Sequence, residues 1–144
     1  MYQVSTSDAR ERCVLDTSNG KTTTKDLLAH VLSSDKKVMC TRGNFNSTIG
    51  VPLSIFECGE NADVAIIEMG ASKPGEIEYI CNIVQPDMGI ITNIYEAHIE
   101  YFGTIEMVAE TKSALFKADT LSLKGPAGIT NPFPIHCVSL KQII

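Results

Sequence analysis

The chain has 144 residues, a formal net charge of −5, and 12 Lys and Arg residues that gather in no one segment. A domain of this length buries roughly two-thirds of the surface of its unfolded chain, which is enough for a real hydrophobic core. The acidic balance argues against a nucleic-acid-binding surface, which needs clustered positive charge. No apolar run approaches the length needed to span a membrane.

The cysteines show no CxxC pair and no histidine at metal-ligand spacing, and the N-terminus lacks the basic and then apolar order of a signal peptide. We therefore expect reduced, mostly buried thiols and a cytoplasmic protein. The cysteines are Cys13, Cys40, Cys58, Cys81 and Cys137.

Apolar runs of strand length alternate with segments of helical period, which predicts an α/β fold with a mostly parallel sheet and helices on both faces. In chain order, a short strand is expected at 13–15 and a weak one at 37–41. Stronger strands are expected at 63–69, DVAIIEM, and at 88–94, MGIITNI. Both are too uniformly apolar for a sheet with one wetted face.

Helices are expected between and after these strands, at 22–33, after Pro74, and from about 105 to 118 with Thr104 as the N-cap. The first helix carries one apolar stripe, formed by Leu27, Leu28, Val31 and Leu32. Beyond residue 118 neither period persists. We therefore divide the chain into a domain at 1–118 and an irregular tail at 119–144.

The segment SNGKTT at 18–23 lies between an apolar run and an amphipathic helix, which is the context of a phosphate-binding loop. Lys21 would face the β- and γ-phosphates, and the Thr22 hydroxyl would ligate Mg²⁺. The full Walker pattern needs glycine where the chain has Leu15, so an ordinary capped turn stays open as an alternative. The expected phosphate contacts are Ser18, Asn19, Gly20, Lys21, Thr22 and Thr23.

Polar residues close the two strong strands at their carboxyl ends, where ligands bind in open parallel sheets. Glu68 closes the first and is expected to bind Mg²⁺ directly or through water. Thr92 and Asn93 close the second, and we expect Asn93 to contact the nucleotide. His98 follows in a loop as a candidate metal or phosphate contact. A solvent-exposed acid and a structural histidine are the alternatives.

Lys112 falls on the apolar stripe of the last helix. A buried ammonium is costly unless it is paired, snorkels to solvent or loses its charge. Snorkelling is the common outcome. The functional alternative is a lysine that reacts with CO2 and becomes a metal-binding carbamate.

Four ordered segments resemble the Mur ligases, and among them the UDP-N-acetylmuramoyl-tripeptide:D-alanyl-D-alanine ligases (MurF). The similarity runs from about residue 15 to 118, so that 1–118 resembles part of their central, ATP-binding domain. The segments are SNGKTTTK from Ser18, TRGNFNSTIGVPLS from Thr41, ADVAIIEMGASKPGEIEYI from Ala62 and PDMGIITNIYEAHIEYFGTIE from Pro86.

The resemblance implies an ATP-dependent amide ligase of peptidoglycan precursor synthesis. In such enzymes ATP phosphorylates the peptide carboxylate of UDP-N-acetylmuramoyl-tripeptide, and D-alanyl-D-alanine then attacks the acyl-phosphate. The implied catalytic residues are Lys21, His98 and Lys112, and the implied magnesium ligands are Thr22, Glu68, His98 and Lys112, the last as a carbamate. Asn44 and Asn46 are implied to lie near the nucleotide or the acyl-phosphate.

The chain departs from the family in its loop, where Thr17 replaces a glycine and Asp16 places a negative charge near the expected phosphates. None of its segments resembles the substrate-binding or closing domains of such ligases. We therefore expect an incomplete ATP site without independent turnover. A non-enzymatic nucleotide-binding or scaffold remnant and an unrelated P-loop NTPase are the alternatives, and an exposed sheet edge would allow self-association.

Overall fold

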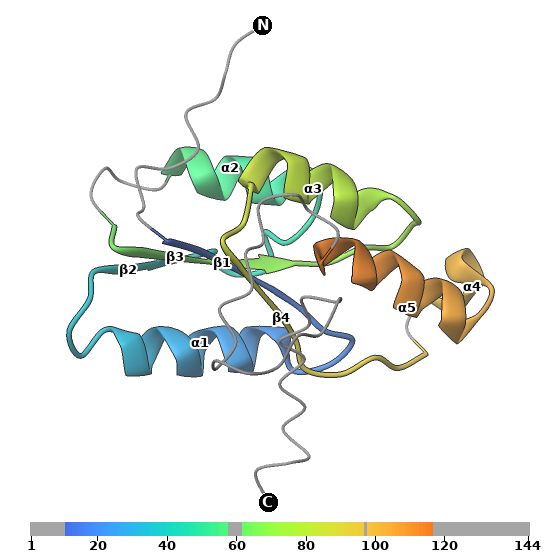
Figure 1. The fold of residues 1–144 in the computed structure, drawn as a ribbon, viewed down its shortest axis with the longest axis horizontal. Helices are drawn as coiled ribbons and strands as arrows, with labels where there is room; N and C mark the ends of the chain where they lie inside the picture. The colour runs from blue at the N-terminus through green and yellow to red at the C-terminus, as the bar shows by residue number, and fades with distance from the viewer. Residues whose placement is uncertain (1–10, 58–61, 97, 117–144) are drawn as a thin grey trace, which may run out of the picture.

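The computed structural model describes residues 11–57, 62–96 and 98–116. In these residues a parallel sheet of four strands has the order β2-β3-β1-β4. Helix α1 covers one face of the sheet, and α2 and α3 cover the other (Figure 1). The predicted α/β fold with helices on both faces is confirmed.

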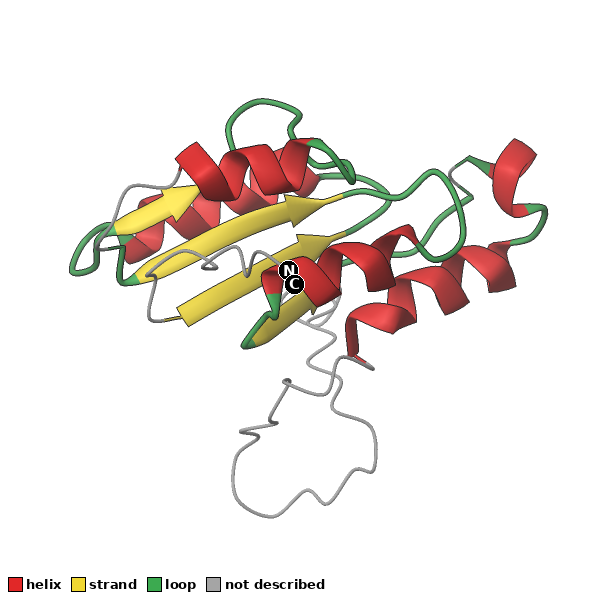
Figure 2. Cartoon of the chain, turned by 90° about the horizontal axis from the view of Figure 1, so that it is seen from above, coloured by secondary structure: helices red, strands yellow, loops and turns green. Residues whose placement is uncertain are grey.

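The strands are β1 (Glu11–Asp16), β2 (Val38–Cys40), β3 (Val64–Met69) and β4 (Met88–Ile91). They all run in one direction, as the arrows in Figure 2 show. In register, Asp16 lies opposite Met69 on one side and Ile91 on the other. The loops that follow β1, β3 and β4 therefore leave the sheet on the same side, at the carboxyl ends of the strands.

Two predicted strand boundaries were wrong. The first strand begins at Glu11 rather than at residue 13, because its polar start pairs with Val64 at the beginning of β3. The fourth strand ends at Ile91 rather than at residue 94. Asn93 instead forms hydrogen bonds with the loop that follows β1.

The helices are α1 (Lys21–Leu32), α2 (Gly50–Glu57), α3 (Glu76–Val84), α4 (Ile99–Phe102) and α5 (Ile105–Ser113), followed by a 3₁₀ turn η1 (Ala114–Phe116). Helices α1, α3 and α5 were predicted. Thr104 is the N-cap of α5 as expected, since its hydroxyl accepts a hydrogen bond from the Met107 N–H at 3.2 Å. None of the helices in the described part of the chain is long and apolar enough to cross a membrane.

Helix α2 was not predicted, and it contains two residues that disfavour helices, Gly50 and Pro52. The backbone of Phe45 passes so close that a Cβ on Gly50 would lie 2.7 Å from its Cα atom. Glycine is therefore required there for a packing reason. The Ser47 hydroxyl accepts a hydrogen bond from the Gly50 N–H at 3.1 Å, and Pro52 lies in the first turn, where its missing N–H costs nothing.

The predicted apolar stripe of α1 was wrong in part. Leu27 is 63% exposed and Val31 58% exposed, whereas the buried residue of α1 is Lys25. The Lys25 ammonium donates a hydrogen bond to the Thr41 carbonyl at 2.8 Å. This polar contact sets the rotation of α1 about its axis. The main core lies instead between the sheet and the elements α2, α3 and η1, and includes Val14, Ile67, Ile77, Ile80 and Leu115.

Candidate functional site

The loop at residues 17–20, named here the β1–α1 loop, connects the buried end of β1 to the first turn of α1. Gly20 has φ 83°, a left-handed conformation that glycine adopts without strain. The Lys21 ammonium folds back and donates hydrogen bonds to the Thr17 carbonyl at 2.6 Å and the Ser18 carbonyl at 3.4 Å. The lysine is therefore hydrogen-bonded to carbonyl groups of its own loop.

Burial lowers the pKa of Lys21, and the positive charge of Lys112 lowers it further. The negative charges of Asp16 and Glu68 act in the opposite direction. The charges of two cationic and two anionic side chains therefore interact at the carboxyl ends of the strands.

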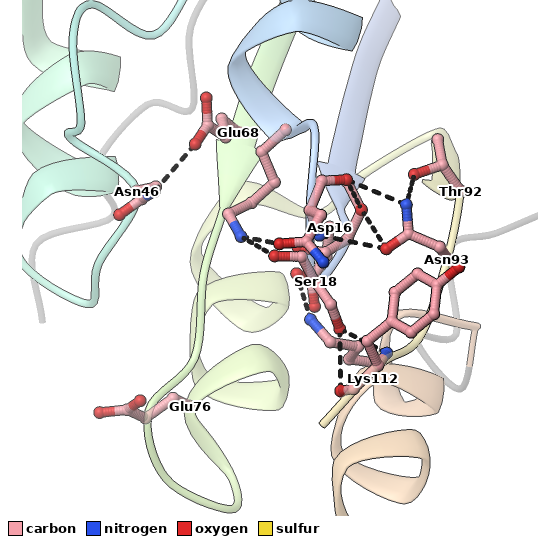
Figure 3. A network of polar contacts seen from close by, with 12 residues as sticks. Asp16, Ser18, Asn46, Glu68, Glu76, Thr92, Asn93 and Lys112 are labelled. Atoms are coloured by element: carbon pink, nitrogen blue, oxygen red, sulfur yellow. Dashed lines mark hydrogen bonds and ion pairs between the residues drawn. The ribbon is translucent and has the colours of Figure 1, made fainter. Parts of the chain in front are cut away.

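Asn93 braces the β1–α1 loop (Figure 3). Its side-chain oxygen accepts hydrogen bonds from the Asn19 N–H at 3.1 Å and the Thr17 hydroxyl at 3.0 Å, and its amide donates to the Asn19 carbonyl at 2.9 Å. The Tyr95 N–H donates to the Ser18 hydroxyl at 2.9 Å. The segment after β4 thus holds the loop in one conformation.

Thr17 fits its place without backbone strain. It is fully buried, and in the described residues only Gln85 and His98 combine a side chain with a positive φ. The fold of the loop therefore does not require the glycine that the Mur ligases have where this chain has Thr17.

Glu68 is a buried carboxylate at the end of β3, with both oxygens in polar contacts. One accepts a hydrogen bond from the Asn46 amide at 2.9 Å, and the other accepts from the Thr22 hydroxyl at 3.2 Å. The Lys25 ammonium lies 3.8 Å from the second oxygen. The alternative of a solvent-exposed acid is excluded, because Glu68 is 2% exposed.

Lys112 does not snorkel to solvent but pairs with Asp16. Its Nζ donates to Asp16 Oδ1 at 2.7 Å, and the side chains are 8% and 0% exposed (Figure 3). The second oxygen of Asp16 is buried and has no hydrogen-bond partner within the described residues. Sequence reasoning missed this pair, although it placed Lys112 on an apolar stripe, where a buried ammonium needs a partner.

A pocket of about 260 Å³ opens at the carboxyl ends of the strands. Residues from five separate segments of the chain line it, which brings together several side chains selected from the sequence. The predicted residues on its wall are Ser18, Lys21, Asn46, His98 and Lys112. Thr22 and Glu68 are connected to this wall through the hydrogen bond between Glu68 and Asn46.

Two of the remaining predicted residues face solvent. Asn44 and Thr23 are exposed, and neither lines the pocket. Their roles stay predictions. His98 is also exposed and has φ 55°, directly before α4. No cluster of three or more His, Cys, Asp or Glu side chains suited to a metal occurs in the described ranges. A cation there would need hydroxyl oxygens as well.

Glu76 and Ser47 are pocket residues that were not predicted. The Glu76 carboxylate accepts hydrogen bonds from the Ser72 and Lys73 N–H groups at 2.7 and 3.0 Å. It thereby shapes the turn that carries the chain from β3 to α3. An acid at the first turn of a helix was the signal that could have found it.

The Mur ligase middle domain model matches residues 18–131 of the chain. Two similar proteins are UDP-N-acetylmuramoyl-tripeptide–D-alanyl-D-alanine ligases. The one from Bacillus subtilis is 46% identical over 95 residues, covering 66% of this chain and 21% of the relative. The one from Borreliella burgdorferi is 42% identical over 132 residues, covering 92% of this chain and 27% of the relative.

Solved structures give the same result. A crystal structure of MurF from Acinetobacter baumannii superposes with a TM-score of 0.77 at 34% identity, covering 85% of this chain and 26% of that one. MurF from Thermotoga maritima in complex with ADP gives a TM-score of 0.72 at 38% identity, covering 76% and 26%. The chain thus spans about a quarter of the length of these relatives. It belongs to the Mur ligase family and carries part of the family's middle domain.

Proposed function

We propose that the chain is the nucleotide-binding part of a ligase that uses ATP to join D-alanyl-D-alanine to UDP-N-acetylmuramoyl-tripeptide. The names of the relatives support this substrate pair. The observation that carries the proposal is the convergence of Lys21, Asn46, His98 and Lys112 on one pocket. A cytoplasmic location follows from the proposal, since ATP and the nucleotide-linked precursor are made there.

The β1–α1 loop has the features of a phosphate site. It leads into a helix of 12 residues, whose free N–H groups and dipole favour an anion at its start. Among the described residues, the Lys21 ammonium is held by the Thr17 and Ser18 carbonyls, so it can turn to a phosphate without breaking an ion pair to any of them. A relative solved with ADP supports this role.

The oxygen atoms around Glu68 fit a magnesium ion. The Thr22 hydroxyl and the Glu68 carboxylate are already in contact at 3.2 Å, and Mg²⁺ prefers such hard oxygen ligands. Asn46 orients the carboxylate, and the Lys25 ammonium lies 3.8 Å from one of its oxygens. When bound, the metal would neutralise charge on the transferred phosphoryl group. His98 is proposed to contact the metal or the phosphate.

Calorimetry of the full chain with ATP and Mg²⁺ tests this proposal. We expect measurable binding that Lys21→Ala weakens at least about tenfold, which corresponds to about 1.4 kcal/mol. Lys37→Ala is the matched control. Lys37 directly precedes β2 at the amino ends of the strands, away from the pocket, so this variant should bind as the parent chain does. Absence of heat at millimolar nucleotide would exclude nucleotide binding by this chain.

A second candidate is a non-catalytic nucleotide-binding or scaffold remnant that pairs with another polypeptide. The Thr17 side chain within the loop and the buried Asp16 carboxylate beside it favour this candidate. The chain should be mixed with a polypeptide that carries the remaining ligase domains, and phosphate release measured with and without D-alanyl-D-alanine. Release that depends on the dipeptide would exclude a purely structural role.

A further inference from the structure

The buried pair of Asp16 and Lys112 has a consequence for the chemistry of the lysine. Asp16 is fully buried at the end of β1, and Lys112 is 6% exposed on α5. In the part of the chain that the structure describes, the Lys112 ammonium is the cation within ion-pair distance of Asp16. A buried carboxylate that loses its counter-charge is strongly destabilising.

Formation of a carbamate would remove that counter-charge. The nitrogen lone pair of Lys112 would form a bond to the carbon of CO2, and the starting ammonium would release two protons to solvent in total. The product, a lysine carbamate, carries a negative charge. The ion pair, which is neutral overall, would thereby become two neighbouring anions, one of them the fully buried Asp16 carboxylate.

Lys21 is a second cation whose charge interacts with that of Asp16, but within the described residues it forms no ion pair with this carboxylate. Burial, with the charges of Asp16 and Glu78 adding to it, raises the pKa of Cys81 to about 12, so that this thiol stays neutral and supplies no counter-charge. Lys21 donates its recorded hydrogen bonds to backbone carbonyls of the loop. The unbonded Asp16 Oδ2 receives no donor from the described residues.

We propose that Asp16 keeps Lys112 as an unmodified ammonium ion, and that the Asp16 carboxylate is the buried anion beside the β1–α1 loop in place of a lysine carbamate. The carbamate implied by resemblance to the Mur ligases is therefore not expected on this chain. The inference does not depend on nucleotide binding, because a chain that binds no ATP still has either a modified or an unmodified Lys112.

The test measures the covalent state of Lys112 in the full chain, incubated with ¹³C-labelled bicarbonate, with and without Mg²⁺. Carbamates are detected by ¹³C NMR, trapped as esters with a trialkyloxonium salt, and assigned by peptide mass spectrometry. The variants are Asp16→Asn and Asp16→Thr, each alone and combined with Lys112→Arg, and circular dichroism establishes which are folded. Asp87→Asn is the matched control, a carboxylate-to-amide change at the other end of the sheet.

We expect no carbamate at Lys112 in the parent chain or in Asp87→Asn. A folded Asp16 variant should show at least tenfold more trapped carbamate at Lys112, and Lys112→Arg should abolish it. A carbamate on the parent chain, with or without Mg²⁺, would overturn the proposal. It would equally be overturned if folded Asp16 variants stay unmodified, because Asp16 would then not be what protects the lysine.

Discussion

Single side chains hold the candidate site together through hydrogen bonds to side-chain and backbone groups far away in the sequence. Asn93 contacts Asn19 and Thr17 across more than seventy residues, and Glu68 connects Asn46 to Thr22. Each of these polar groups is satisfied by the protein itself. A ligand that enters must therefore replace contacts of similar quality.

Replacing Asn93 with alanine should loosen the β1–α1 loop. The change removes an acceptor for the Asn19 N–H and a donor to the Asn19 carbonyl. We expect a loss of about 1–2 kcal/mol in the free energy of unfolding, measured by urea denaturation, together with weaker nucleotide binding. Asn82→Ala on the exposed face of α3 should change neither quantity. Equal stability of both variants would show that the brace contributes nothing.

At the scale of elements, packing against neighbours decides where helices form and how strands are held together. Helix α2 forms although its sequence contains both a glycine and a proline, because Gly50 allows the chain at Phe45 to pass closely. Strands β1 and β4 are connected at their beginnings by Arg12 and Asp87, whose charged atoms lie 3.0 Å apart.

Gly50→Ala should destabilise the fold by about 1–3 kcal/mol, because the new methyl group would overlap backbone atoms of Phe45 that cannot move independently. The quantity to measure is again the free energy of unfolding. Gly70→Ala is a suitable comparison, since its Cβ would meet the Asn46 side chain at an ordinary 3.4 Å. The Gly50 prediction would be contradicted if both variants lost the same small amount.

The contribution of the Arg12–Asp87 pair should depend on pH. Burial alone would raise the pKa of Asp87, but the hydrogen bonds and charge of Arg12 outweigh it and lower the pKa from 3.8. A carboxylate with a lowered folded-state pKa stabilises the fold above its unfolded pKa, and this stabilisation is lost as the pH falls through the folded value.

The corresponding variant is Asp87→Asn. We expect it to be less stable than the parent chain at pH 7 by at most about 1 kcal/mol, since Asp87 is 40% exposed and water screens the pair. The difference should shrink once the pH falls below 3.8, which thermal unfolding at several pH values can follow. A difference that stays constant down to pH 2 would show that charge is not the cause.

For the whole molecule, the described sheet has two edges, β2 and β4, that no strand of the described ranges covers. Apolar side chains are also exposed on and beside α2, namely Phe45, Ile49, Leu53 and Phe56. Uncovered edges and apolar surface both favour association between copies. We propose that the isolated chain self-associates through the sheet edge.

Sedimentation at increasing concentration should show a rising average mass. Val38→Lys places a charge on edge strand β2 and should reduce the association, as charged residues on natural edge strands do. The double variant Leu53→Ser with Phe56→Ser removes apolar surface from α2 instead and should leave it unchanged. If only the double variant lowers the mass, the contact is made by α2 and not by the edge.

The sequence by itself was sufficient for the α/β class, the strongest strands and five of the twelve residues of the pocket wall. These follow from local periodicity, from the position of polar residues at strand ends and from the motifs shared with the Mur ligases. The rotation of α1 could not be predicted in this way. Its stripe of Leu27 and Val31 had the right period, but the contacts of Lys25 with Thr41 and Glu68 turned it outward. Only the tertiary structure decided that Lys112 meets Asp16, because partners 96 residues apart are brought together by the order of the strands and leave no local pattern.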